Sequence, residues 1–321
     1  MPFSYEAIDA TAFLAFPEQS SMLQTELAER LQIDASAQTA YGDLLVVPFV
    51  PAECPLPFWC RTAMLEPNII HFDSIGDAAS ALRAMQRSWA PYQYAHFRRA
   101  ALIQQKLPHV QLKPRTFPCE LPASPIGLYT LIDEHTMIAS AKTSSVLPAG
   151  TLSWIEDHKN PPSRAYLKLQ ESLVLARHFF GVDLPHSKSR CLEAGACPGG
   201  WTHVLVQLGA KVHAVDRTEL VPSLMQNPLV TFQTHDAFTL SPEELGMFDW
   251  VFSDVICYPG RLLEWIQRWL SSGNTKNMIC TIKLQGTTDW QMIEKFAQIP
   301  QSRVVHLNYN KHELTFIHCG E

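Results

Sequence analysis

The C-terminal half of the chain carries the pattern of an α/β domain built on a largely parallel sheet. Short apolar runs that end on a polar residue alternate there with stretches of helical length. A glycine-rich loop, G-A-C-P-G-G at residues 195–200, directly follows the first apolar run. Residues 1–157 show smaller strand–helix–strand units, which are typical of a separate α+β domain. We therefore expect two domains, residues 1–157 and 158–321.

The N-terminal half is expected to alternate short strands with two helices. In the second helix, Ala78, Leu82, Met85 and Trp89 fall on one face. Many of the 23 prolines lie between residues 49 and 125 and indicate irregular connections. The predicted strands are residues 11–16, 44–49, 68–72, 127–132 and 136–139, and the predicted helices are residues 21–31 and 75–89.

One segment of this half is basic, although the net charge of the chain is −6. That net charge gives no bulk attraction to nucleic acid, so any contact with RNA requires a local patch. Residues 96–115 contain no acid, and they are the candidate surface for phosphate groups. The alternative is a solvated helix face without a partner. The candidate RNA-binding residues are Arg98, Arg99, Lys106, Lys113 and Arg115.

The boundary between the two halves is expected near D-H-K-N-P-P at residues 157–162, because two prolines end the preceding structure. Ser163 is a reasonable N-cap for a helix over residues 164–180. Seven strands follow, and the last is expected to run antiparallel to the others. After the first strand, the predicted strands are residues 212–215, 229–232, 248–253, 277–282, 304–307 and 312–319, with helices over residues 260–270 and 289–299. This order is typical of the Rossmann-like class I methyltransferase sheet.

The glycine loop departs from the dinucleotide pattern G-x-G-x-x-G. Cys197 and Pro198 occupy the place where a second glycine would clear room for a pyrophosphate. A ligand without phosphates fits better, and S-adenosylmethionine is the common one. Glu193 could hold its cationic amino-acid end, and Asp216 could accept hydrogen bonds from its ribose hydroxyls. A dinucleotide, or a glycine turn without any ligand, remains an alternative.

The glycines of this loop are each expected to have a conformational role. Gly195 should allow a sharp turn off the first strand, and Gly199 with Gly200 should let a ligand lie against bare backbone.

Composition and cysteine usage favour a cytoplasmic protein. The eight cysteines form no C-x-x-C pair and no Cys/His cluster with zinc spacing, so a reducing compartment and no metal are expected. The N-terminus has early acids and no basic region, and no apolar run approaches membrane-spanning length. Nothing in the sequence demands a dimer, so we expect a monomer without a membrane partner.

At several segments, residues 163–321 resemble the FtsJ-like ribose 2′-O-methyltransferases. The matching segments are S-R-A-Y-L-K-L, E-A-G-A-C-P-G-G-W, S-D-V, T-I-K-L-Q-G and H-E-L-T-F. The resemblance implies that the catalytic Lys-Asp-Lys-Glu tetrad of that family falls on Lys168, Asp254, Lys283 and Glu313. It also implies cofactor contacts at Gly195, Pro198, Gly200, Trp201, Asp216 and Asp236, with Asp236 facing the adenine amine.

The resemblance implies methyl transfer from S-adenosylmethionine to a ribose 2′-hydroxyl of RNA, with ribosomal RNA as the substrate and S-adenosylhomocysteine as the product. Lys283, with a pKa lowered by burial and neighbouring charge, is expected to remove or share the hydroxyl proton. Asp254 and Glu313 would steer that lysine and offset its charge, and Lys168 would either position the ribose or balance the carboxylates. Family and size further imply an RNA-binding, THUMP-containing N-terminal half.

Two other functions stay open at this point. An RNA cytosine-C5 methyltransferase would use a cysteine thiolate, for which Cys257 and Cys280 are the candidates. That hypothesis leaves Lys168 and Glu313 without a role, and D-V-I-C-Y-P differs from the expected D-A-P-C-S-G. The other alternative is a catalytically silent RNA-binding protein that has kept the fold.

Overall fold

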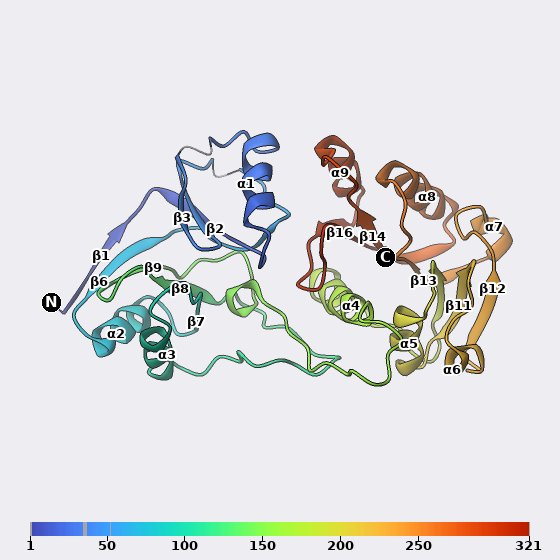
Figure 1. Ribbon diagram of the computed structural model, residues 1–321, viewed down its shortest axis with the longest axis horizontal. Helices are drawn as coiled ribbons and strands as arrows, with labels where there is room; N and C mark the ends of the chain where they lie inside the picture. Colours follow the sequence, from blue (N-terminus) through green and yellow to red (C-terminus); the bar gives the residue numbers. More distant parts are fainter. Residues whose placement is uncertain (1, 35–36, 52, 321) are drawn as a thin grey trace. The chain divides into compact units, whose positions relative to one another are not determined.

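The computed structural model describes residues 2–34, 37–51 and 53–320, and the chain divides into two compact units (Figure 1). The N-terminal unit comprises the residues up to Arg115 together with Leu121–Ser153. The C-terminal unit comprises Thr116–Glu120 and the residues from Trp154 onward. The main division therefore lies a few residues before the predicted boundary at residue 157. The assignment of the short segment Thr116–Glu120 to the C-terminal unit is not foreseen by the sequence, and there the Phe117 ring packs edge-on against Trp154.

Two sheets form the N-terminal unit. Within the larger sheet, β7 pairs in parallel with β8, and the other neighbouring strands are antiparallel. The larger sheet has the strand order β1 (Phe3–Ala7), β6 (Asn68–Phe72), β9 (Thr136–Ser140), β8 (Gly127–Leu131) and β7 (Trp89–Pro91). The smaller sheet has the order β3 (Thr39–Tyr41), β4 (Leu44–Pro48), β2 (Ala10–Ala15) and β5 (Cys60–Met64). The helices are α1 (Ser20–Glu29), α2 (Ile75–Met85) and α3 (Phe97–Gln105), and a 3-10 turn, η2, spans Pro148–Gly150.

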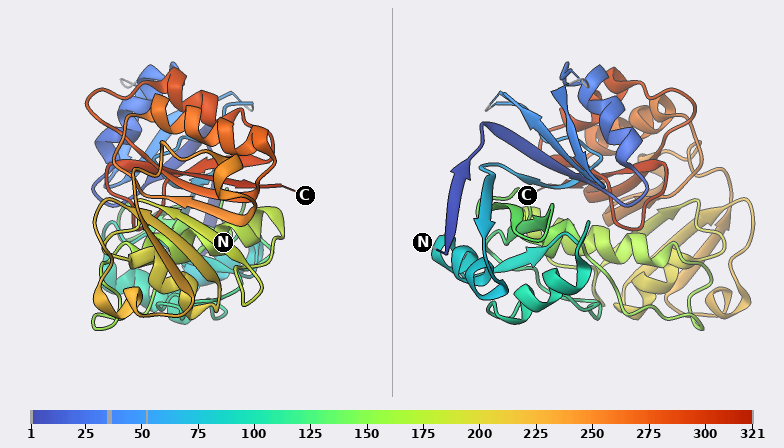
Figure 2. Two further views of the ribbon diagram at one scale, coloured as in Figure 1. Left: turned by 90° about the vertical axis from the view of Figure 1, so that its right-hand side faces the viewer. Right: turned by 60° about the vertical axis from the view of Figure 1, so that its left-hand side comes forward.

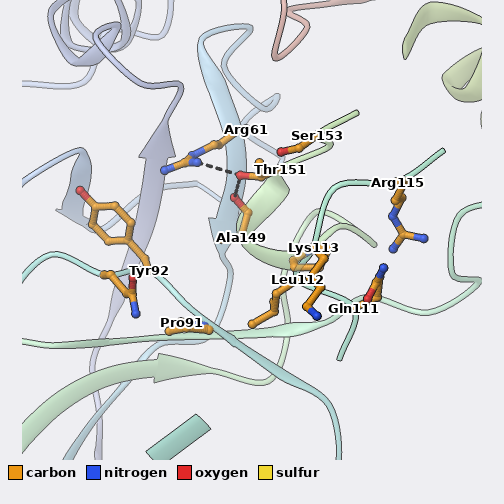
Figure 3. Close-up of a pocket in the computed structure, with 12 residues that line it drawn as sticks. Arg61, Pro91, Tyr92, Gln111, Leu112, Lys113, Arg115, Ala149, Thr151 and Ser153 are labelled. Carbon is orange, nitrogen blue, oxygen red and sulfur yellow. Dashed lines mark hydrogen bonds between the residues drawn. The ribbon is translucent and has the colours of Figure 1, made fainter. Parts of the chain in front are cut away.

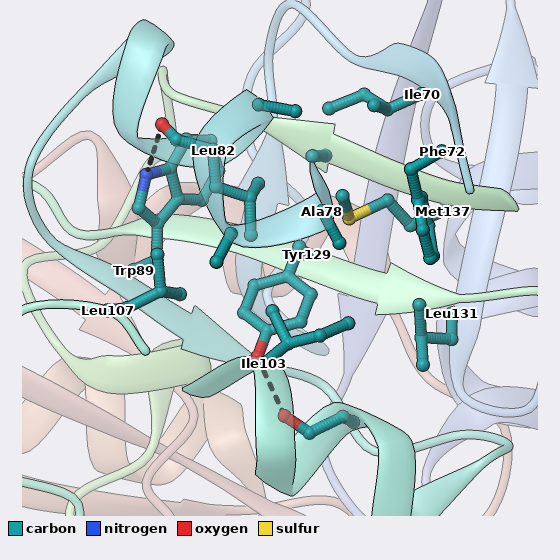
Figure 4. Packing of buried hydrophobic residues seen from close by; sticks show 14 residues of the cluster. Ile70, Phe72, Ala78, Leu82, Trp89, Ile103, Leu107, Tyr129, Leu131 and Met137 are labelled. Atoms are coloured by element: carbon teal, nitrogen blue, oxygen red, sulfur yellow. Dashed lines mark hydrogen bonds between the residues drawn. The ribbon is translucent and has the colours of Figure 1, made fainter. Parts of the chain in front are cut away.

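The core of the larger sheet lies under α2 and α3 (Figure 4). Leu82 of α2, Ile103 of α3 and Tyr129 of β8 are all fully buried in it. The Tyr129 hydroxyl donates a hydrogen bond to the Ala100 carbonyl, which ties α3 to the sheet. The predicted helix over residues 75–89 is too long, because the chain is extended at Gln86 and Trp89 begins β7.

A seven-stranded mixed sheet forms the centre of the C-terminal unit. Its order is β12 (Val230–Thr234), β11 (Lys211–Asp216), β10 (Arg190–Ala194), β13 (Phe248–Ser253), β14 (Thr275–Lys283), β16 (Glu313–Cys319) and β15 (Ser302–Val305). The five strands from β12 to β14 are parallel, whereas β16 runs antiparallel to both of its neighbours. The predicted Rossmann-type α/β architecture is confirmed.

Helices cover both faces of this sheet. Figure 2 shows α8 (Pro259–Ser272) and α9 (Trp290–Ala297) on one face, with α4 (Tyr166–Phe180) and α5 (Gly200–Gln207) on the other. Two short helices, α6 (Pro222–Met225) and α7 (Pro242–Leu245), lie in the connections beside β12 and before β13. The expected N-cap at Ser163 is wrong, since α4 begins at Tyr166 and Ala165 precedes it without a side-chain cap. Within the described residues, no helix has the length and apolarity needed to span a bilayer.

We predict that Leu82→Ala lowers the free energy of unfolding of the N-terminal unit by about 2–5 kcal/mol, because it removes buried methyl groups and leaves a cavity. Urea unfolding of the intact chain, followed by circular dichroism and tryptophan fluorescence, measures this change. The control is Leu102→Ala on α3, where the side chain is 38% exposed and about 0.5 kcal/mol or less should be lost. Equal losses in the two variants would contradict this packing.

Candidate active site

Two lysines and two acids from four separate elements form a closed ring of ion pairs. Lys168 Nζ lies 2.9 Å from Asp254 Oδ2 and 2.9 Å from Glu313 Oε1. Lys283 Nζ lies 2.7 Å from Asp254 Oδ1 and 2.7 Å from Glu313 Oε2. Each charge therefore contacts two charges of the opposite sign, and the ring as a whole is neutral.

The topology of the sheet explains why these four residues meet. Lys168 comes from the first turn of α4, and Asp254 directly follows β13. Lys283 is the last residue of β14, and it lies directly opposite Glu313, the first residue of β16, in the antiparallel register. Since β13 and β14 are parallel neighbours, their carboxyl ends lie at the same edge of the sheet. This is the edge at which ligands bind in open α/β sheets.

The ring is largely shielded from water, so its charges affect one another strongly. The side chains of Lys168, Glu313, Lys283 and Asp254 are 10%, 11%, 18% and 20% exposed. Burial alone would raise the pKa of Asp254, but the two lysines outweigh it and hold that pKa below its ordinary value. Burial alone would lower the pKa of Lys283, but Asp254 and Glu313 outweigh it and raise that pKa. The lowered pKa expected for Lys283 is therefore wrong, and this lysine is an ammonium at neutral pH.

A buried acid that the sequence analysis overlooked holds the loop that precedes Glu313. Glu171 accepts hydrogen bonds from the backbone N–H groups of Asn308 and Tyr309, at 2.9 and 3.3 Å, and from the Asn308 side chain at 2.7 Å. Burial raises the pKa of Glu171 to about 7. Glu171 could have been found from the sequence, because it lies three residues after Lys168. That spacing places the two side chains on one face of a largely apolar helix.

The predicted cofactor loop follows β10, and Glu193 lies just before it. The Glu193 side chain is buried and accepts a hydrogen bond of 2.5 Å from the Thr202 hydroxyl of α5. Burial raises the pKa of Glu193 to about 8, and the nearby negative charges of Asp254 and Asp216 act in the same direction. A cation beside this carboxylate would favour its charged form. Thr202 carries no sequence signal of its own, although a carboxylate within an apolar strand requires a donor of this kind.

The glycines of the loop clear space for protein atoms, and their predicted role toward a ligand stays a prediction. A Cβ added at Gly200 would lie 2.4 Å from Ser163 Oγ, and one added at Gly199 would lie 2.3 Å from Leu224 Cδ1. Trp201 is also packed within the fold, and its indole N–H donates to the Ala165 carbonyl at 2.9 Å. These residues therefore shape the loop by fixing α4 against α5. Gly195 follows β10 with a positive φ of 77°, as expected for a sharp turn off the strand.

Two further acids lie at the carboxyl end of β11 and just after β12. Asp216 accepts hydrogen bonds from the backbone N–H groups of Cys197 and Thr218, both at 2.9 Å, which joins the end of β11 to the glycine loop. Asp236 forms ion pairs with Arg217 at 2.6 Å and Arg261 at 3.4 Å. Burial opposes ionisation of Asp236, but hydrogen bonds and these two arginines hold its pKa below the ordinary value.

This set of groups fits S-adenosylmethionine. Glu193 offers a buried carboxylate to a cation, and Asp216 retains lone pairs that can accept hydrogen bonds from ribose hydroxyls. Among the described residues, the loop at residues 195–200 contains no basic side chain that would neutralise a pyrophosphate. The Pro198 carbonyl accepts a hydrogen bond from the Val221 N–H, so the proline also serves the packing of the loop.

The predicted RNA-binding residues divide into two groups in the N-terminal unit. Arg98 on α3 and Lys106 just after it are exposed. Arg99 is half-buried, and its guanidinium lies 5.7 Å from the centre of the Phe72 ring, so it packs on the fold. Lys113 and Arg115 lie beyond this helix and line a separate cavity.

The two cysteines of the cytosine-C5 alternative are poorly suited to nucleophilic attack. Cys257 is 8% exposed and Cys280 is fully buried. Burial raises the pKa of both thiols. Because the thiolate is the nucleophile, both environments oppose that chemistry.

We predict that Glu193→Gln changes how stability depends on pH. The pKa of Glu193 is raised on folding, so its stabilising contribution is complete below about pH 4.5 and is lost as the pH rises toward 8. Relative to the parent chain, the variant should therefore gain stability across this window by up to about 1 kcal/mol per pH unit. Urea unfolding at several pH values measures this difference. Parallel stability curves for parent and variant would contradict the raised pKa.

Comparison with known proteins agrees with this geometry. Residues 161–287 match the model of the FtsJ-like methyltransferase family. A protein of Edwardsiella ictaluri named ribosomal RNA large subunit methyltransferase M (RlmM) is 37% identical over 131 residues, which cover 38% of this chain and 33% of that protein. The protein of the same name from Hahella chejuensis is 32% identical over 199 residues, which cover 58% of this chain and 47% of the relative. The matched region thus spans less than half the length of these relatives.

Among solved structures, a ribosomal RNA methyltransferase of Plasmodium falciparum has a TM-score of 0.36 and 16% identity, covering 49% of this chain and 97% of that chain; this similarity is too low to support a conclusion. The C-P-G-G-W loop and the W-L-S-S-G helix end predict an RlmM-type protein within the FtsJ-like group, and the names of the curated relatives agree with that prediction. Residues 161–287 are therefore similar to FtsJ-like methyltransferases, among them relatives named RlmM, and this similarity supports S-adenosylmethionine as the cofactor.

Proposed function

We propose that this protein transfers a methyl group from S-adenosylmethionine to a ribose 2′-hydroxyl of RNA. The closed ring of Lys168, Asp254, Lys283 and Glu313 carries this proposal, because it lies at the ligand-binding edge of an FtsJ-like domain. The relatives named ribosomal RNA large subunit methyltransferase M support ribosomal RNA of the large subunit as the substrate. A cytidine ribose of 23S ribosomal RNA is the most specific form of the proposal.

The chemical difficulty of this reaction is the weak nucleophilicity of a ribose hydroxyl at neutral pH. The cofactor supplies a methyl group on a cationic sulfur, and the sulfur–carbon bond breaks as the oxygen–carbon bond forms. Lys283, as an ammonium, donates a hydrogen bond to the 2′-oxygen and stabilises the negative charge that develops there. The hydroxyl proton passes to the Glu313 carboxylate of the ring, so that the overall charge balances, because the lowered pKa of Asp254 makes that carboxylate a weak base.

The remaining members of the ring have positioning roles. Lys168 contacts both carboxylates and keeps them oriented while Lys283 turns toward the substrate. Holding the oxygen near the methyl group, at about 3 Å, supplies much of the rate of such a transfer.

The cofactor is held, on this proposal, at the carboxyl ends of β10, β11 and β12. Glu193 binds the amino-acid end, Asp216 binds the ribose, and Asp236 faces the adenine amine, which requires its pairs with Arg217 and Arg261 to rearrange. The backbone of the loop completes the site through Gly195, Cys197, Pro198, Gly199, Gly200 and Trp201.

The N-terminal unit presents the RNA in this proposal. Exposed cations on and after α3, together with Lys113 and Arg115, form its basic surface. A THUMP-like fold of this unit and a monomeric state are also part of the proposal. A cytoplasmic location follows from the proposed ribosomal RNA substrate.

We predict that the parent chain transfers a tritium-labelled methyl group from S-adenosylmethionine to total RNA from a strain that lacks the gene. Digestion to nucleosides should release a labelled 2′-O-methylnucleoside, 2′-O-methylcytidine in the most specific case. Lys283→Ala should lower the rate about 100- to 1,000-fold, because it removes the cation beside the 2′-oxygen. Isothermal titration should show that cofactor binding is retained.

The control variant is Lys276→Ala on the same strand, since its ammonium is 56% exposed and pairs with Asp249 away from the ring. Its rate should equal that of the parent. Label on the C5 position of a base would support Cys257 and Cys280 instead. Cofactor binding without any label on RNA would support a silent binding protein.

We also predict a plateau in the single-turnover rate between about pH 7 and pH 9. The raised pKa of Lys283 keeps the ammonium intact across this range, and the rate should fall only when that group loses its proton at higher pH. A rate that rises tenfold per pH unit through the same range would show that the neutral lysine is the base.

A further inference from the structure

A cavity of about 340 Å³ lies within the N-terminal unit, and the proposed catalytic chemistry does not use it (Figure 3). It borders the edge strands of both sheets, since Arg61 belongs to β5 and Pro91 to β7. The turn η2 contributes Ala149, and the segment between α3 and Thr116 contributes Lys113 and Arg115. A volume of this size lies at the lower end of the range for small-ligand pockets.

The cavity is lined by cationic side chains. Arg61, Lys113 and Arg115 line it, and within the described residues no acidic side chain does. The whole chain has a net charge of −6, so this gathering of cations is a local feature. Hydroxyl and amide groups provide further hydrogen-bond donors around these cations, from Gln93, Gln111, Thr151 and Ser153.

Arg61 is held in place, and part of its hydrogen-bonding capacity is unused. Its Nη1 donates to Thr151 Oγ1 at 2.9 Å, and its guanidinium lies 5.8 Å from the centre of the Tyr92 ring. Its Nε is buried and has no hydrogen-bond partner in the part of the chain that the structure describes. Buried donors normally have a partner, so this N–H is an unsatisfied polar group on a residue that lines the cavity.

The backbone around the cavity has a constrained geometry. Ala149 has a positive φ of 48°, which is uncommon for a residue with a Cβ. Gly150 follows with a φ of 66°, and a Cβ there would lie 2.2 Å from the Arg61 carbonyl oxygen. This close approach places Thr151 against the Arg61 side chain. The Arg115 N–H donates to the Ser153 carbonyl at 2.7 Å, which holds the second cationic segment beside the first.

We propose that this cavity binds a phosphate group of an RNA strand, with the hydroxyl and amide groups contacting the adjoining ribose. An arginine fork and a lysine are well suited to phosphate oxygens. The choice of RNA as the source of the phosphate rests on the proposed function, because a free nucleotide or inorganic phosphate offers the same chemistry. The site lies apart from the cations of α3, and it assigns Arg61 a role in RNA binding.

The test compares two double variants of the full chain that lose the same charge. Lys113→Gln with Arg115→Gln alters the cavity, whereas Arg87→Gln with Lys142→Gln alters exposed cations of the same unit that do not line it. Binding of a fluorescein-labelled, single-stranded RNA of 20 nucleotides is measured at several salt concentrations. The cavity variant should bind about tenfold more weakly and lose about 0.7 from the slope of log K against log salt for each phosphate contact removed.

A third variant, Arg61→Lys, keeps the charge but removes the fork and the Nε–H. It should also weaken binding, by about three- to tenfold, with an unchanged circular dichroism spectrum. Equal effects of the cavity and control double variants would overturn the proposal, because they would show that only total charge matters. Adenosine 5′-monophosphate and inorganic phosphate are tested in the same way. If either binds the parent chain but not the cavity variant, while both chains bind RNA equally well, the assignment to RNA is also overturned.

Methyl transfer separates this inference from the proposed function. The cavity variant should need about tenfold more RNA to reach its half-maximal single-turnover rate, whereas Arg87→Gln with Lys142→Gln should need the same RNA concentration as the parent. If the parent binds RNA through the cavity but transfers no methyl group, the proposed function fails and the RNA-binding site stands.

Discussion

The closed ring of ion pairs among Lys168, Asp254, Lys283 and Glu313 is the constraint on which the C-terminal unit depends. Each member comes from a different element, so the ring closes only when α4, β13, β14 and β16 are all in place. Removing one charge would leave its partners buried and incompletely paired, which typically costs about 3–5 kcal/mol. Such an arrangement contributes little net stability compared with apolar packing, and this favours a chemical role for it.

The ring also determines which protonation states are available for chemistry. Two carboxylates around Lys283 outweigh its burial, so the lysine keeps its proton, and two lysines around Asp254 keep that carboxylate charged. In contrast, Glu193 is buried without such compensation, and its pKa rises to about 8. The same edge of the sheet thus holds the neutral ring of ion pairs and, near it, Glu193, whose ionised form a bound cation would favour. This contrast suits a site that accepts a cationic ligand and a polar nucleophile together.

Positive charge in the N-terminal unit is arranged by the fold and is not spread evenly along its basic segment. Arg99 packs on Phe72, whereas Arg98 beside it is exposed. Lys113 and Arg115 line the same cavity as Arg61, which precedes them by about 50 residues in the chain. The cavity that they share therefore depends on the edges of two sheets and on the strained turn η2.

The sequence by itself determined the alternation of elements and the polar residues at the strand ends, because these follow from local periodicity. The strand over residues 248–253 and the strand over residues 68–72 were predicted with the bounds that the structure shows. Periodicity carries no information about which distant side chains meet. The partners of Glu193 and Glu171, the packing role of Gly200, the contribution of Arg61 and the raised pKa of Lys283 were decided only by the tertiary structure. All of these depend on how segments far apart in sequence pack, and that packing sets burial, hydrogen bonding and charge at each site.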